Sequence, residues 1–146
     1  MRIAIGCDHR GVDFKNFIIK FLIEEGYNCQ DFGTNSPEPM DYPDIARPLG
    51  EAVVRGEFER GILICNTGIG MSIAANKIKG VRAALCHNRF YAERARQHND
   101  ANIICLGTVM DEEAARETVN AFLNTAFEGG RHARRLDKVR EIEESY

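Results

Sequence analysis

One cysteine followed by a glycine-bearing turn is the stretch of this sequence best suited to chemistry. Residues 61–65 form a short apolar run that ends in Cys65, residues 66–70 include two glycines, and residues 71–77 return to helix-forming types. This order predicts a strand, a tight turn and a helix. At the carboxyl end of a parallel strand, the N-terminus of the next helix offers free N–H groups to anions. The stretch therefore predicts a thiol beside an anion-binding turn.

The order of residues in this turn excludes four familiar kinds of binding or catalytic site. A phosphate-binding Walker loop would need Lys after Gly70, and a cysteine phosphatase would carry Arg six positions after its cysteine, but Met71 stands at both places. A dinucleotide fingerprint would need a third glycine at Ile73. A metal site would need a second Cys or a His in the loop. The alternative is structural, with Cys65 a small buried core residue and the glycines turn formers.

Other polar side chains follow predicted strands as well. The three clusters are Asp8 with His9, Cys65 with Thr67, and His98 with Asn99. We expect them at or just beyond the same edge of one sheet, in one pocket or in pockets shared across a dimer. Simpler roles are open: Asp8 could cap the first helix, and His98 could complement a helix dipole. Arg131 and Arg135, four apart on one helix face, could be a solvated surface pair.

Composition limits the class of protein. The 146 residues predict one domain, residues 1–146. A net charge of −3 with dispersed basic residues argues against nucleic-acid binding and leaves small neutral or anionic metabolites open. The five cysteines are odd in number and lack Cys-x-x-Cys spacing, which predicts reduced thiols and a cytoplasmic location. No signal peptide or membrane-spanning run is expected, so we predict no membrane partner.

Strand-like and helix-like segments alternate along the chain. Expected strands cover residues 2–5, 27–31, 61–65, 81–86 and 103–106, and expected helices follow at 14–26, 44–56, after the turn to 77, 90–97 and 111–124. This alternation predicts a mostly parallel five-stranded sheet with helices on both faces. Asp44 is expected to cap the second helix, where Pro48 is tolerable only in the first turn.

Two segments remain outside this alternation. Residues 33–43 form a turn-rich loop at the side of the sheet where ligands bind, so we expect it to act as a rim. Residues 129–146 predict a charged helix whose apolar stripe, Leu136, Val139 and Ile142, is too narrow for a core helix. The stripe therefore predicts docking on a partner subunit.

The chain resembles the B-type ribose-5-phosphate isomerases, whose wider group includes allose-6-phosphate and galactose-6-phosphate isomerases. The motifs that carry the resemblance are residues 6–9, 41–43, 61–77, 96–100, and 129–132 with Arg135. Five motifs in the right order, over nearly the whole length, make the match specific. The resemblance implies a Rossmann-like three-layer α/β/α sandwich with a five-stranded parallel sheet. It also implies a homodimer or a dimer of dimers, with active sites at the subunit interface.

The implied activity is the interconversion of an aldose phosphate and a ketose phosphate, here ribose 5-phosphate and ribulose 5-phosphate, through an enediolate. The resemblance implies no cofactor and no metal. It makes Cys65 the general base, because N–H donors and a helix N-terminus favour a thiolate. The five main-chain N–H groups from Asn66 to Gly70, those of Thr67, Gly68 and Ile69 included, would form the anion hole, where glycine permits close approach.

The remaining roles are implied in the same way. Thr67 would hydrogen-bond the reacting oxygens, and His98, assisted by Asp8, would open the sugar ring because imidazole titrates near neutrality. The binding roles fall to Asn99 for sugar hydroxyls, Tyr42 as pocket lining, and His9, Arg131 and Arg135 for the phosphate. His98 and the arginines lie far along the chain from Cys65, so the other subunit could supply them.

The sequence departs from the family's pattern at two places. Asn66 stands where the family usually has Gly, and residues 107–109 lack an arginine that commonly contributes to phosphate binding. Three explanations are open: weaker binding, substitution by Arg89 or Arg134, or a preferred substrate other than ribose 5-phosphate, such as allose 6-phosphate or galactose 6-phosphate. A non-catalytic sugar-phosphate-binding module of the same fold is a further alternative. The joint presence of a base and a ring-opening histidine argues against it.

Overall fold

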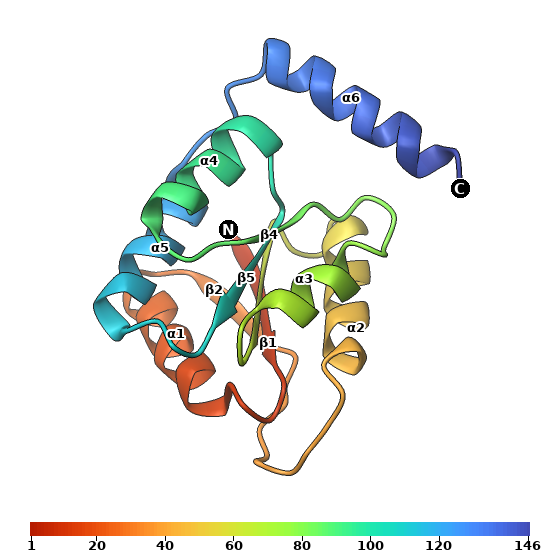
Figure 1. Cartoon of the computed structure of the whole chain (residues 1–146). Coiled ribbons are helices and arrows are strands. Elements are labelled where there is room, and N and C mark those ends of the chain that lie inside the picture. The colour runs from red at the N-terminus through yellow and green to blue at the C-terminus, as the bar shows by residue number, and fades with distance from the viewer.

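A twisted sheet of five parallel strands lies between two layers of helices in the computed structural model, which describes residues 1–146 (Figure 1). The strands are β1 (Arg2–Cys7), β2 (Asn28–Asp31), β3 (Arg60–Cys65), β4 (Ala83–Leu85) and β5 (Ile103–Gly107). The helices are α1 (Val12–Glu24), α2 (Pro43–Val54), α3 (Ile69–Ala75), α4 (Arg89–Asn99), α5 (Glu112–Asn124) and α6 (Arg131–Glu144). The strand order is β2-β1-β3-β5-β4. The predicted Rossmann-like sandwich is confirmed, and β3 is its central strand.

Side chains of the central strand alternate between the two helical layers. Ile62 and Ile64 pack into the cluster that also holds residues of α1, α4 and α5. Leu63 and Cys65 pack into the cluster with residues of α2 and α3. This alternation is the period of two of a strand buried on both faces. It puts the Cys65 side chain in the same layer as the helix that begins at the following turn.

The start of α2 differs from the expectation. Its N-cap residue is Tyr42 and Pro43 is its first helical residue, so Asp44 lies within the first turn and does not cap the helix. An acidic side chain there is still favourable, because the N-terminus of a helix is positive. The expectation that Pro48 is tolerable only in the first turn is also wrong, since Pro48 lies inside the helix beyond its first turn. Pro48 is exposed, so its ring displaces no core side chain.

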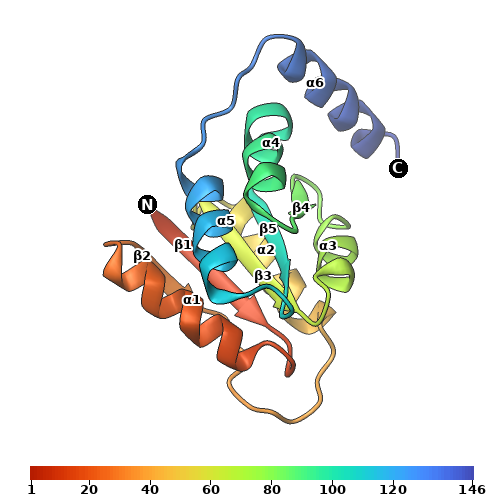
Figure 2. The same ribbon diagram turned by 60° about the vertical axis from the view of Figure 1, so that its left-hand side comes forward.

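The last helix stands apart from the sandwich. Figure 2 shows α6 beyond the end of α4, separated from α5 by an extended segment. Val139 and Ile142 on its apolar stripe are 51% and 62% exposed. With Leu136 they border an open cavity of about 900 Å³ whose other wall includes Val81 and Ala84; we call it the α6 groove. None of the helices is long and apolar enough to cross a membrane.

Candidate functional site

The turn between β3 and α3 holds the thiol against main-chain donors. Cys65 is 5% exposed, and its Sγ accepts a hydrogen bond of 3.2 Å from the N–H of Gly68. Gly68 has a φ of 80°, the left-handed conformation that favours glycine, and it directly precedes α3. The N–H of Ile69 donates to Thr67 Oγ1 at 3.1 Å. The cysteine and threonine predicted to act together are therefore the two side chains that this turn organises.

The N–H groups of the turn divide into two kinds. Those of Gly68 and Ile69 have acceptors within the turn. Those of Asn66, Thr67 and Gly70 have no hydrogen-bond acceptor within the chain. Unpaired main-chain donors next to a helix N-terminus favour an anion or an oxyanion. Of the five predicted donors, three are thus available to a ligand.

Close packing on β4 and β5 keeps the turn in place. A Cβ atom at Gly68 would lie 2.7 Å from Leu85 Cδ1, and one at Gly107 would lie 3.0 Å from the main chain of the turn. The N–H of Thr108 also donates to the carbonyl oxygen of Asn66 at 3.1 Å. The Asn66 side chain is exposed and forms no hydrogen bond within the chain. The extra side chain at this position therefore leaves the turn's main-chain path intact.

The loop after β1 lies beside this turn. The N–H of Asp8 donates to the carbonyl oxygen of Ile64 on β3, and the buried Asp8 carboxylate accepts from the N–H of Arg10 at 3.0 Å. The N-cap of α1 is Gly11, with no side-chain cap. The capping alternative for Asp8 is therefore wrong. Its carboxylate is held at the carboxyl edge of the sheet, next to the end of the central strand.

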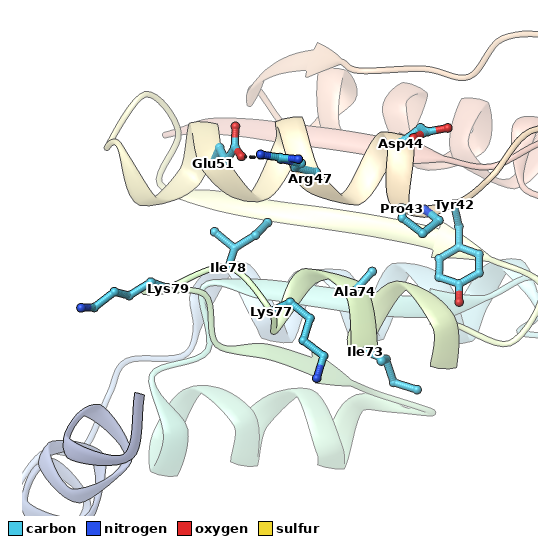
Figure 3. Close-up of a pocket in the computed structure, with 10 residues that line it drawn as sticks. All are labelled: Tyr42, Pro43, Asp44, Arg47, Glu51, Ile73, Ala74, Lys77, Ile78 and Lys79. Atoms are coloured by element: carbon cyan, nitrogen blue, oxygen red, sulfur yellow. Dashed lines mark hydrogen bonds and ion pairs between the residues drawn. The ribbon is translucent and has the colours of Figure 1, made fainter. Parts of the chain in front are cut away.

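The predicted rim loop contacts both of these segments. His9 Nδ1 accepts a hydrogen bond of 3.2 Å from the N–H of Met40. At the end of the loop, the Tyr42 ring packs on Gly70, where an added Cβ would lie 2.7 Å from Tyr42 Cζ. Tyr42 also lines a cavity of about 790 Å³ between α2 and α3, in which Lys77 is another polar wall residue (Figure 3). Tyr42 thus lies between this cavity and the turn.

Substituting Gly70 by alanine tests this packing. The new methyl group would displace the Tyr42 ring, and overpacking of this kind costs about 1–3 kcal/mol. We expect KM for the substrate to rise by roughly tenfold, the equivalent of about 1.4 kcal/mol, with a smaller change in kcat. Steady-state kinetics of Gly70→Ala, Tyr42→Ala and the double variant measure the coupling. If Gly70→Ala raised KM equally in wild type and in Tyr42→Ala, a clash with the Tyr42 ring could not be the cause.

His98 and Asn99 lie at the opposite edge of the sheet, which corrects the expectation of a shared edge. They end α4, and the chain then enters β5 at Ile103, which pairs with Gly61 at the start of β3. Cys65 is four residues further along β3, a rise of about 13 Å. The expectation failed because α4 runs antiparallel to the strands and carries its last turn back to their amino ends. One chain therefore does not bring His98 to the thiol.

His98 has an unexpected neighbour at that edge. Its ring stacks on the ring of His132 from α6, with centroids 4.2 Å apart and planes 10° from parallel. His132 is 4% exposed and its Nε2 lies 3.5 Å from Glu128 Oε1. Burial and the adjacent His98 lower the pKa of His132, which favours its neutral form.

These three side chains are also the chain's candidate metal ligands. His98, Glu128 and His132 each place a ligand atom within 4.8 Å of the others. Imidazole lone pairs lie in the ring plane, so two stacked parallel rings direct them side by side and not toward one point. The arrangement fits a pair of histidines in contact better than the converging ligand set that a tetrahedral cation needs.

The arginines proposed for phosphate binding share this edge. Arg131 and Arg135 lie in the first turns of α6, are exposed, and form no ion pair within the chain. Arg134 is exposed there as well. Arg89 instead begins α4 at the carboxyl edge, and its Nε donates to Glu93 at 2.6 Å. The free guanidinium groups are therefore near His98, far from the thiol of their own chain.

The other four cysteines are unsuited to act as a base. All five cysteines are free thiols. Burial raises the pKa of Cys7 and of Cys29 to about 11, and that of Cys86 to about 12. Burial also raises the pKa of Cys105 well above its usual value. These thiols stay protonated at neutral pH, which leaves Cys65 as the thiol placed at the turn.

Two residues at these sites received no role from the sequence. Lys15 is fully buried, and His132 contacts His98. The signal for Lys15 was its spacing, because it precedes Ile18 and Leu22 by three and seven residues and so lies on the buried face of α1. No local pattern could have indicated the His132 contact, which joins two helices.

The chain is similar over almost its whole length to sugar-phosphate isomerases of known sequence and structure. Ribose-5-phosphate isomerase B of Escherichia coli is 45% identical over 144 residues, 98% of this chain and 97% of that protein. D-erythrulose-4-phosphate isomerase of Pectobacterium atrosepticum is 43% identical over 141 residues, 95% and 93% of the two chains. The structure of Clostridium thermocellum ribose-5-phosphate isomerase B superposes with a TM-score of 0.98 at 50% identity, covering 100% of this chain and 99% of that one. The family model described as Ribose/Galactose Isomerase matches residues 3–139, and the chain belongs to this family.

Proposed function

We propose that this chain is an aldose–ketose isomerase that interconverts D-ribose 5-phosphate and D-ribulose 5-phosphate through an enediolate. The observation that carries the proposal is the turn after β3, where the Cys65 sulfur lies against the Gly68 N–H beside three unpaired main-chain donors. Relatives named ribose-5-phosphate isomerase B, at 45–50% identity over almost the whole chain, support the same substrate. Residues 1–146 act as one sugar-phosphate isomerase domain.

The turn supplies the proton transfer. The Cys65 thiolate removes the proton from C2 of the open-chain sugar and returns it to C1. The negative oxygen formed in between accepts hydrogen bonds from the N–H groups of Asn66, Thr67 and Gly70, and Thr67 Oγ1 lies beside them. The Gly68 N–H already donates a hydrogen bond to the Cys65 sulfur, and in this proposal that bond stabilises the thiolate without any movement of the chain.

A second subunit completes the site. In this proposal the partner's His98 opens the furanose ring, assisted by Asp8 of the first chain, and the partner's Asn99 binds sugar hydroxyls. The phosphate lies between His9 and the partner's Arg131 and Arg135, which form no ion pair in their own chain. The protein is then a homodimer or a dimer of dimers. The exposed stripe on α6 and the exposed Ile69 and Ile73 on α3 support such an interface.

The location proposed for this enzyme is the cytoplasm. Its five cysteines are all free thiols, and Cys65 must remain reduced to act as a base. A reducing compartment maintains both conditions.

A panel of substrates tests the proposed function. Turnover is measured with ribose 5-phosphate, allose 6-phosphate, galactose 6-phosphate and D-erythrulose 4-phosphate under identical conditions. We expect kcat/KM to be highest for ribose 5-phosphate, by about tenfold or more, since one carbon more or less changes transition-state binding by about 1–3 kcal/mol. A higher value for a four- or six-carbon substrate would replace ribose 5-phosphate in the proposal. No turnover of any of them would favour a binding module.

A further inference from the structure

We propose that Lys15, a buried lysine on α1 remote from the reacting atoms, is a positioning residue that holds the rim loop over the substrate site, through the part of that loop that precedes α2, residues 33–42. The inference rests on the proposed function for what the loop contacts. Lys15 is fully buried. A buried ammonium group is costly unless it is fully paired, so its partners indicate what the charge is used for.

All three donors of the ammonium group are directed at one small region. Lys15 Nζ donates to Asp31 Oδ1 at 2.9 Å, to the carbonyl oxygen of Thr34 at 2.6 Å and to Asn35 Oδ1 at 2.8 Å. An ammonium has three donors, so none is left over. Asp31 ends β2, and the other two residues begin the rim loop. Lys15 therefore fixes the point where the chain leaves the sheet.

The same point is also paired with β1. The Cys7 N–H donates to the Gly33 carbonyl at 2.6 Å, and the Thr34 N–H donates to the Cys7 carbonyl at 2.7 Å. Asp31 Oδ1 accepts from the Gly33 N–H at 2.7 Å as well as from the lysine. The first part of the loop is thus joined directly to the strand that continues into Asp8 and His9.

The far part of the loop has few such bonds and carries the functional contacts. Its Met40 N–H donates to His9 Nδ1 at 3.2 Å, and Tyr42, the residue that ends it, packs on Gly70 of the turn. Glu38 and Pro39, which precede Met40, are exposed, and the one side-chain bond there is local, from the Glu38 N–H to Ser36 Oγ. The path of residues 36–42 therefore depends on its two ends. Loss of the Lys15 anchor would move His9 and Tyr42, the groups proposed to contact phosphate and to line the pocket.

The test replaces Lys15 by methionine, which keeps the length of the side chain and removes its three donors. Lys20→Met is the matched control, because Lys20 lies on the same helix and is exposed without side-chain bonds. We expect Lys15→Met to raise KM for ribose 5-phosphate by about tenfold and to leave kcat within about threefold, since substrate positioning is lost while Cys65 and its turn remain. Hydrogen exchange at the Met40 amide should also accelerate by roughly tenfold or more, which a purely structural role elsewhere would not cause.

Asn35→Ala keeps the proposal testable if Lys15→Met does not fold. It removes one acceptor from an exposed residue, and we expect about a threefold rise in KM with faster exchange at Met40. Unchanged Met40 exchange in the folded variants would overturn the proposal, as would faster exchange with unchanged KM. If the wild-type protein turned over no sugar phosphate, the proposed function would fail by itself. In that case the affinity of wild type and Lys15→Met for inorganic phosphate would test the anchor separately. The proposal requires Lys15→Met to bind phosphate more weakly than wild type.

Discussion

Cys65→Ala is expected to lower kcat for the isomerisation of ribose 5-phosphate by about a thousandfold, within the range that a general base contributes. The alanine removes the sulfur that receives the Gly68 N–H and leaves the left-handed turn and the α3 N-terminus unchanged. The substrate still meets the same main-chain donors. We therefore expect inorganic phosphate to bind with an affinity within a few-fold of wild type, because the loss falls on proton transfer.

The measurement follows the carbon-bound proton itself. NMR in deuterated water records the exchange of the C2 proton of ribose 5-phosphate, which Cys65→Ala should abolish. Cys29→Ala is the matched control, because its thiol is free, half-buried on β2, and kept protonated by a pKa of about 11. Exchange at more than a tenth of the wild-type rate in Cys65→Ala would show that another group is the base.

A mixture of two inactive variants is expected to recover activity. In a two-fold symmetric dimer, each proposed site combines the turn of one chain with His98 of the other. A mixed dimer of Cys65→Ala and His98→Asn chains then contains one site with both substitutions and one with neither. Because random pairing makes half of the dimers mixed, activity on ribose 5-phosphate should return to about a quarter of wild type.

The structure supplies the reason for expecting this result. His98 ends α4 at the amino edge of the sheet, and Cys65 ends β3 at the carboxyl edge, so no single chain holds both groups together. Co-expression of the two variants with different affinity tags isolates the mixed dimers. The assay runs from ribose 5-phosphate, because ribulose 5-phosphate is acyclic and needs no ring opening.

A second pair of variants provides the control. Cys65→Ala and Thr67→Ala both alter the same turn, so their mixed dimer has a defect in each site and should remain inactive. Recovery of activity in this pair would indicate contamination with wild-type protein. Absence of recovery in the first pair, with mixed dimers isolated, would show that the partner's His98 does not serve the turn, and the shared site would have to be abandoned.

Local pattern determined most of the architecture. The apolar run of β3, the glycine turn and the helix after it follow from residues adjacent in sequence, because strand and helix periods and left-handed glycines are short-range properties. All five strands, their parallel alignment and the helices on both faces of the sheet could be anticipated in this way. The N-cap of α2 could not, because Tyr42 serves there with no side-chain cap of its own, and Pro43 supplies the helical φ.

Relations between distant segments were decided only by the tertiary structure. The sequence predicted a base, a ring-opening histidine and phosphate-binding arginines, but the antiparallel course of α4 puts His98 at the other edge of the sheet from Cys65. The bonds of Lys15 to the rim loop depend equally on how α1 packs on β1 and β2. Residue types fix which chemistry is possible, whereas helix direction and packing fix which groups meet, because those contacts join residues that no local period relates.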